Sequence, residues 1–175
     1  VFSYEESYGY MLGDYVRDKD AVTASMLLTE MAAWYAAQGM TLFDALNALY
    51  EKYGYYAEKT HNLVMPGLDG LRDMAELMRK LKDEPPTEIA GTEVVVRKDY
   101  NDGTVHDCRT GAVTKMELSG SNVLRFELAD GTTILARPSG TEPKIKVYIL
   151  ARGKDAVDAA ANVEKYGAWA EALKG

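Results

Sequence analysis

Residues 122–151 read NVLRFELADGTTILARPSGTEPKIKVYILA, and this stretch decides the fold. Apolar side chains alternate with polar ones along most of it, as at Leu124, Phe126 and Leu128. A period of two residues is typical of β-strands that bury one face. Ala129-Asp130-Gly131 has the composition of a tight hairpin turn. The stretch therefore predicts successive antiparallel strands, over Asn122–Leu128, Thr132–Arg137 and Ile145–Ala151.

Neighbouring segments extend this sheet. The runs Glu93–Arg97 and Val113–Leu118 are also rich in strand-forming residues. Ser119-Gly120-Ser121 predicts a hairpin between the second of these runs and the strand that starts at Asn122. We expect one face of the resulting antiparallel sheet to be apolar and buried.

Two helices are predicted to cover that face. The first starts at Pro66 and Gly67 and carries an apolar stripe as far as Leu81. The second begins at Asp155, whose side chain can cap it, and continues to Leu173. The fold class is therefore predicted to be α+β, an antiparallel sheet with two helices on one face.

The chain before this sheet is predicted to be mainly helical. After a strand-like start at Val1–Tyr4, a helix capped by Asp18 or Asp20 runs to Gly39, and its apolar stripe is interpreted as core. Thr41 and Asp44 resemble a capping box for a second helix that ends at Gly54. A Tyr- and Lys-rich connection is expected between Gly54 and Gly67. Because the chain opens on Val1 without Met, we expect it to be part of a larger protein.

The loop Arg137-Pro138-Ser139-Gly140-Thr141-Glu142-Pro143-Lys144 lies between the last two predicted strands and has the chemistry of a phosphate site. An Arg fork matches two phosphate oxygens, hydroxyls supply further donors, and Gly lets the backbone approach closely. The two prolines limit the chain entropy that is lost when a ligand binds. An ordinary Pro/Gly-rich turn is the alternative interpretation of the same residues.

Composition excludes several classes of function. The 175 residues carry a net charge of −7, which argues against nucleic acid or anionic membrane lipid as the main partner. An anionic sugar phosphate would also be repelled at long range, so its affinity must come from the local cations Arg137, Lys144 and Lys146. Cys108 is the single cysteine, which excludes an intrachain disulfide. No signal peptide or membrane span is recognisable, and a cytoplasmic location is expected.

A second polar constellation lies near the N-terminus. Glu5 and Ser7 flank Glu6, and in an extended segment both would point to the same side, where they could bind adjacent sugar hydroxyls. Lys19 lies in the sequence Arg17-Asp18-Lys19-Asp20 and could carry a proton or neutralise developing negative charge. Solvated surface charge is the alternative interpretation of both groups.

These motifs together resemble the α-D-phosphohexomutases, the phosphoglucomutase and phosphomannomutase family. The octapeptide loop is similar to the family's phosphate-binding loop, which implies that Arg137, Ser139, Gly140, Thr141 and the nearby Lys146 bind substrate phosphate. The resemblance implies that Glu5 and Ser7 bind sugar hydroxyls and that Lys19 lies in the active-site cleft. Some branches place a His after the Glu-x-Ser-Gly segment, whereas this chain has Gly9 and Tyr10, which favours Lys19 over a His as acid or base.

The resemblance covers the last part of a four-domain architecture. It implies that residues 1–56 end the third domain, a mainly helical remnant of an α/β domain. Residues 57–175 would form the fourth domain, which is TATA-binding-protein-like. The phosphoserine loop and the Mg²⁺ site of such enzymes belong to the first two domains, so no metal ligand or cofactor is expected in this chain, and the chain alone is expected to be inactive.

The resemblance implies hexose phosphates as substrates, interconverted between the 1- and 6-phosphates. Three alternatives remain open from the sequence: a non-catalytic module that binds phosphosugars or another partner, a mutase for pentose phosphates, and a mutase for N-acetylhexosamine phosphates. Because the first block lacks the strands that its helices should cover, we also expect exposed apolar surface there, or an oligomer that buries it.

Overall fold

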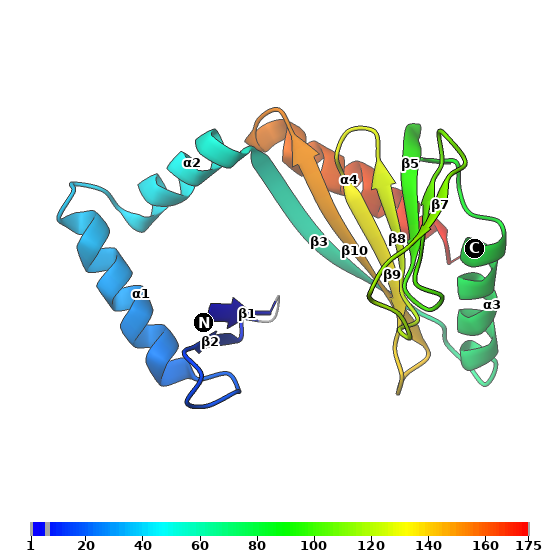
Figure 1. Ribbon diagram of the computed structural model, residues 1–175, viewed down its shortest axis with the longest axis horizontal. Coiled ribbons are helices and arrows are strands. Elements are labelled where there is room, and N and C mark those ends of the chain that lie inside the picture. The colour runs from blue at the N-terminus through cyan, green and yellow to red at the C-terminus, as the bar shows by residue number, and fades with distance from the viewer. Residues whose placement is uncertain (1, 6–7, 175) are drawn as a thin grey trace. The chain divides into compact units, whose positions relative to one another are not determined.

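A computed structural model describes residues 2–5 and 8–174 and divides the chain into two compact units. Unit 1 comprises Val1–Tyr53 and unit 2 comprises Gly54–Gly175 (Figure 1). Each unit has its own sheet, and the sheet of unit 2 contains the strands predicted from residues 122–151.

Unit 1 pairs a small hairpin with two helices. Strands β1 and β2 are antiparallel, and the helices α1 and α2 follow them; the bounds are β1 Phe2–Tyr4, β2 Tyr10–Leu12, α1 Ala21–Ala36 and α2 Leu42–Tyr53. Asp20 rather than Asp18 is the N-cap of α1, because its carboxylate accepts hydrogen bonds from the backbone N–H groups of Val22 (2.9 Å) and Thr23 (3.4 Å). The predicted capping box of α2 is confirmed: the amide of Thr41 donates to Asp44 (2.8 Å) and the amide of Asp44 donates to Oγ1 of Thr41 (3.1 Å).

The interpretation of the α1 stripe as core is wrong for this chain. No residue of α1 is buried, and Trp34 and Val22 are 60% and 78% exposed. In α2 only Ala45 is buried. The spacing of the apolar residues is helical, as predicted, but within the described residues of unit 1 nothing covers the stripe. The second expectation, exposed apolar surface in this block, therefore fits the structure.

The main sheet of unit 2 is antiparallel throughout. Its strands follow the spatial order β3-β10-β9-β8-β5-β6-β7, and the short β4 pairs with β5. The bounds are β3 Tyr55–Val64, β4 Glu88–Ile89, β5 Thr92–Asp99, β6 Thr104–Asp107, β7 Val113–Lys115, β8 Leu124–Leu128, β9 Thr133–Pro138 and β10 Lys144–Gly153. The three strands predicted from the opening stretch are thus confirmed as β8, β9 and β10.

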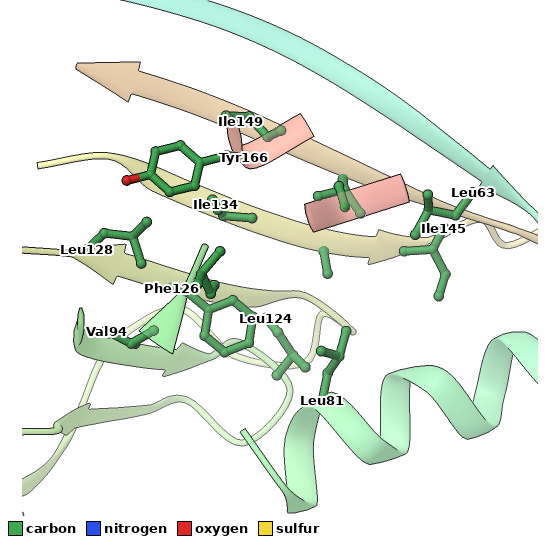
Figure 2. Close-up of a cluster of buried hydrophobic side chains, with 14 of the residues drawn as sticks. Leu63, Leu81, Val94, Leu124, Phe126, Leu128, Ile134, Ile145, Ile149 and Tyr166 are labelled. Atoms are coloured by element: carbon green, nitrogen blue, oxygen red, sulfur yellow. The ribbon is translucent and has the colours of Figure 1, made fainter. Parts of the chain in front are cut away.

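The helices α3 (Gly70–Asp83) and α4 (Ala156–Ala172) contribute to the single core of unit 2. Figure 2 shows Leu81 of α3 and Tyr166 of α4 directed into the same cluster as the alternating strand residues Phe126, Ile134 and Ile149. Fully burying an apolar side chain of this size stabilises the fold by about 1.5–3 kcal/mol. The predicted α+β class, with helices packed on an antiparallel sheet, is confirmed.

The predicted connection after Gly54 is wrong, because residues 55–64 form the long edge strand β3. It pairs with β10 along its whole length, from Tyr55 opposite Gly153 to Val64 opposite Lys144. Its alternation is masked because polar residues occupy inward positions. Lys59 pairs with Glu164 of α4 at 2.8 Å, and Nδ1 of His61 lies 2.9 Å from Glu171. Acidic residues of α4 thus pair with the polar side chains that made β3 unrecognisable in the sequence.

Two further boundaries differ from the prediction. The hairpin expected at Ser119-Gly120-Ser121 is absent among the described residues: β7 pairs with β6, and β8 pairs with β5. The turn residues instead contact the loop between β5 and β6, where Gly120 N–H donates to the carbonyl of Asn101 at 3.3 Å. Helix α3 begins at Gly70, after a bend at Gly67 that follows Pro66. Gly70 cannot carry a Cβ there, because it would lie 2.2 Å from the carbonyl oxygen of Met65.

Candidate functional site

The loop between β9 and β10 is the centre of the candidate site. The two strands are direct neighbours, and Lys146 of β10 lies opposite Arg137 of β9 in their register. Beyond this pair the backbone closes with a hydrogen bond from Ser139 N–H to the carbonyl of Lys144 at 2.9 Å. The strands therefore fix the two ends of the loop and leave its tip to form a recess.

Three cations share this recess. Arg137, Lys144 and Lys146 line a cavity of about 270 Å³ together with Pro138, Ser139, Gly140 and Glu142. The period of two along β9 and β10 places the cations opposite the face that holds Ala136, Ile145 and Val147 in the core. The helices thus pack on one face, and the loop presents its charges on the other. Such a recess can bind a small multiply charged anion.

The hydroxyl of Ser139 organises the loop tip. Its Oγ accepts hydrogen bonds from the backbone N–H groups of Thr141 (3.4 Å) and Glu142 (3.3 Å). Thr141 itself is exposed and does not line the cavity. Of the residues predicted to bind phosphate, the structure brings Arg137, Ser139, Gly140 and Lys146 around one recess. Thr141 lies in the same loop but outside the recess wall.

One acidic residue also belongs to the recess. The carboxylate of Glu142 pairs with Nζ of Lys144. Its pKa is lowered, chiefly because Lys144 donates a hydrogen bond and attracts the charge, and in smaller part because Lys146 is close. Glu142 is thus ionised at neutral pH and directly next to the cations.

The second predicted group lies in unit 1, around the turn between β1 and β2. Nζ of Lys19 lies 2.8 Å from Oε1 of Glu5. This contact passes over Gly9, where an added Cβ would lie 2.2 Å from Cδ of Lys19 and 2.5 Å from the Glu5 carboxylate. A side chain at position 9 would displace the ends of both side chains, so glycine leaves the room in which Glu5 and Lys19 meet. Ser7, the other predicted hydroxyl-binding residue, lies outside the described residues.

The ion pair determines what Lys19 can do. Its pKa is raised, first by the hydrogen bond to Glu5 and then by the charge of that carboxylate. A lysine that holds its proton more firmly is a poorer proton donor but a reliable cation. Between the two roles suggested by the sequence, this arrangement favours neutralisation of charge over proton transfer.

Within residues 2–5 and 8–174, no group of three or more His, Cys, Asp or Glu side chains could hold a metal ion. None of the helices in the same part of the chain could span a lipid bilayer.

The sequence analysis counted Lys144 among the local cations but not among the residues to which the family resemblance assigns phosphate binding, and it did not recognise Glu142 as part of the site. The period of two supports Lys144 as a binding residue, because it places Lys144 on the same side of β10 as Lys146. Glu142 carries no such signal, because its place in the recess depends on how the loop tip folds back. Both residues line the cavity with Arg137.

The fold and the basic hairpin loop define unit 2 as a domain of the phosphohexomutase C-terminal type. The family model for the phosphoglucomutase/phosphomannomutase C-terminal domain matches residues 62–164. The model for alpha/beta/alpha domain III of the same enzymes matches residues 1–53. The chain belongs to the phosphoglucomutase/phosphomannomutase family.

Individual relatives agree with this assignment. The chain is 37% identical over 149 residues to a phosphoglucomutase of Staphylococcus aureus strain bovine RF122 / ET3-1. The aligned residues cover 85% of this chain and 27% of that protein. It is 35% identical over 163 residues to the phosphoglucomutase of strain N315, and this alignment covers 93% of this chain and 29% of that protein. The chain thus spans less than a third of these relatives.

A solved structure shares the fold at low identity. It is the open form of the exocytosis-sensitive phosphoprotein pp63/parafusin, a phosphoglucomutase from Paramecium. The TM-score is 0.59 at 18% identity, and the match covers 96% of this chain and 29% of that one. At this identity the likeness concerns the arrangement of helices and strands.

Proposed function

We propose that this chain is the C-terminal, substrate-binding part of a mutase that interconverts hexose 1-phosphate and hexose 6-phosphate. In this proposal the loop at the end of β9 and β10 binds the phosphate that does not react. Holding the distal phosphate positions the reacting end of the sugar, and positioning is a main source of rate in phosphoryl transfer.

The observation that carries the proposal is the convergence of Arg137, Lys144 and Lys146 on one recess. Arg137 can bind two phosphate oxygens with its guanidinium fork, and the lysines can add charge-assisted hydrogen bonds. Ser139 and the backbone of Gly140 lie at the same wall and can complete the donor set. Thr141 can join only if the loop tip rearranges around the ligand.

Unit 1 would supply contacts to the sugar. Glu5, already next to Lys19, can accept hydrogen bonds from ring hydroxyls, and Ser7 is proposed to do the same. Lys19 is proposed as a cation in the active-site cleft. The preferred sugar phosphate depends on residues in several domains, so these contacts are assigned to hexoses as a class.

The remaining chemistry is assigned to the domains that the longer relatives possess and this chain does not cover. The phosphoserine that exchanges phosphate with the substrate and the Mg²⁺ ion that would stabilise the transferred group are placed there. The bisphosphorylated intermediate must reorient in the active-site cleft before the second phosphoryl transfer. The C-terminal loop must therefore bind phosphate firmly enough to position it and loosely enough to release it.

Titration of the 175-residue chain with glucose 6-phosphate, followed by NMR of the loop amides, tests the proposal. Arg137→Ala should weaken binding by about 1.5–3 kcal/mol, roughly 10- to 150-fold, because a bidentate charge-assisted pair is lost. Arg137→Lys should recover only part of this, since a point charge does not reproduce the fork. Ser139→Ala should cost about 0.5–1.5 kcal/mol if its hydroxyl donates one hydrogen bond.

Two controls make the result specific. Arg109→Ala removes an equally charged side chain that pairs with Glu93 at 2.6 Å, outside the recess, and should leave affinity unchanged. Plain glucose should bind the wild-type chain and Arg137→Ala equally, because the loop recognises phosphate. If Arg137→Ala reduced glucose and glucose phosphate binding alike, the loop would be structural and the proposal would be withdrawn.

A further inference from the structure

Glu142 occupies an unusual position for an acidic residue, because it lines the recess in which three cations converge. Its carboxylate pairs with Lys144, and its pKa is lowered by Lys144 first and by Lys146 to a smaller extent. The carboxylate thus occupies the cation, Lys144, that an incoming phosphate would also bind.

The backbone holds Glu142 in this position. Its N–H donates to Oγ of Ser139 at 3.3 Å, and its carbonyl accepts from Lys144 N–H at 2.8 Å. Pro143 separates Glu142 from Lys144 and restricts the φ angle between them. These contacts fix the backbone on both sides of the pair, so the two side chains start from neighbouring positions.

The charges at the recess balance a phosphate dianion when Glu142 is counted. Arg137, Lys144 and Lys146 contribute three positive charges and Glu142 one negative charge, which leaves a net charge of +2. Without Glu142, three unopposed cations would attract a dianion more strongly. When Glu142 is present, the cost of displacing its carboxylate from Lys144 reduces the net attraction for the dianion.

We propose that Glu142 is an internal competitor of the substrate phosphate: it pairs with Lys144 in the free loop and leaves that lysine when phosphate binds. This inference rests on the proposed function of the loop. Its consequence is a phosphate site whose affinity is limited and whose release is accelerated by a residue of the same loop.

The exposure of the pair makes the exchange feasible. The Lys144 side chain is 25% exposed and that of Glu142 is 60% exposed. Ion pairs in contact with water contribute little to stability, so a ligand can break this one at low cost. A phosphate that also contacts Arg137 gains stronger charge-assisted hydrogen bonds in return. The carboxylate can swing outward into water, where its charge is solvated.

Glu142→Gln tests the inference because it removes the charge and keeps the shape. We expect the 175-residue variant to bind inorganic phosphate and glucose 6-phosphate about 3- to 10-fold more tightly than the wild type, with slower dissociation in NMR exchange measurements. Glu117→Gln is the matched control, since it makes the same charge change at an exposed residue outside the recess. Its affinity should stay within about twofold of the wild type.

A second measurement follows the wild-type carboxylate itself. The ¹³C carboxyl signal of Glu142 should titrate at a higher pH when the chain is saturated with inorganic phosphate than when it is free. Loss of Lys144 as a partner and the negative charge of the ligand both predict this direction. The measurement needs no variant, so a folding defect in Glu142→Gln would not decide the outcome.

The outcomes separate this inference from the proposed function. If Glu142→Gln binds phosphate equally or more weakly while Arg137→Ala loses binding, the competitor role is wrong and the phosphate site stands. If the wild-type chain shows no saturable response to phosphate, or Arg137→Ala binds as well as the wild type, the proposed function itself fails. An unchanged Glu142 titration at phosphate saturation would also overturn the competitor role.

Discussion

Tyr166 shows how one residue secures helix α4 to the sheet. It is the largest fully buried side chain of the described residues. Its hydroxyl hydrogen-bonds the carboxylate of Asp130 and lies 2.9 Å from Oγ1 of Thr92, which also accepts a hydrogen bond from Nζ of Lys165 at 2.8 Å. A phenol in the core is acceptable because these polar partners meet it at the end of its ring.

Tyr166→Phe should therefore lower the free energy of unfolding by about 1–2 kcal/mol at neutral pH, since a buried hydrogen bond is lost while the ring still packs. Urea unfolding followed by circular dichroism measures this difference. Tyr148→Phe, on the opposite side of β10, is the control and should cost less than about 0.5 kcal/mol. An equal effect in both variants would contradict the role assigned to the Tyr166 hydroxyl.

The same residue predicts a dependence on alkaline pH. Burial first, and then the hydrogen bond to Asp130, raise the pKa of Tyr166 to about 12 from an ordinary value near 10. The protonated Tyr166 hydroxyl contributes its full stabilisation below pH 10, and this contribution is lost as the pH rises through 12. The free energy of unfolding should fall by at most about 2.7 kcal/mol over this range. The difference in free energy of unfolding between the wild type and Tyr166→Phe should therefore decrease between pH 10 and pH 12 in unfolding titrations. A gap that widens above pH 10 would refute the assignment.

At the scale of the element, helices of similar length differ sharply in what they bury. Helix α1 has 16 residues and none is buried, whereas the 17 residues of α4 include the buried Ala159, Val163, Tyr166, Gly167 and Ala170. Most of the stability of a protein helix comes from packing of its apolar face rather than from intrinsic propensity. The two helices should therefore open with very different free energies.

Amide hydrogen exchange tests this difference. In a monomeric 175-residue chain, the amides of α1 should exchange much faster than those of α4, because few buried contacts oppose local opening. Light scattering on the same sample establishes the oligomeric state. Equal protection of both helices in a monodisperse monomer would contradict the expectation. Protection of α1 that appears only with dimer formation would show that a second copy covers its apolar stripe.

Elements were predictable from sequence where their partners are close in the chain. Strands β8, β9 and β10 follow one another, so alternation and turn residues sufficed to predict them. Strand β3 was missed because Lys59 and His61 point toward α4, and their partners Glu164 and Glu171 lie far away in sequence. A polar residue in an inward position is compatible with a strand only when such a partner exists, and sequence does not reveal it.

The candidate site follows the same rule. Arg137, Ser139 and Gly140 were found because the loop itself has the composition of a phosphate site. Glu142 was not recognised, because its pairing with Lys144 depends on how the loop tip is folded. The contact between Glu5 and Lys19 could not be anticipated either, since it depends on how the chain between residues 5 and 19 folds back.

For the whole molecule, the share of the relatives that this chain covers bears on activity. The chain corresponds to 27–29% of the staphylococcal phosphoglucomutases. We expect the purified 175-residue chain to show no conversion of glucose 1-phosphate to glucose 6-phosphate, even where it binds both. The phosphoserine and the metal site assigned to the other domains would be absent from the assay.

A coupled assay with glucose-6-phosphate dehydrogenase measures this, with a full-length staphylococcal phosphoglucomutase as the positive control. Turnover that copurifies with the chain and is lost in Arg137→Ala would overturn the assignment of the chemistry to other domains. Turnover that persists unchanged in that variant would indicate a contaminating enzyme.

The long pairing of β3 with β10 also orders the events of folding. The β8-β9-β10 hairpins join neighbouring segments, whereas β3 pairs with a strand far along the chain, so we expect the closure of that large loop to be the slower step. Until β3 docks, β10 presents an unpaired edge beside apolar residues such as Val147 and Ile149. Exposed strand edges of this kind promote aggregation of folding intermediates. Once β3 is paired it forms the edge of the sheet itself, and its exposed charged residues Glu58 and Lys59 make that edge a poorer template for aggregation.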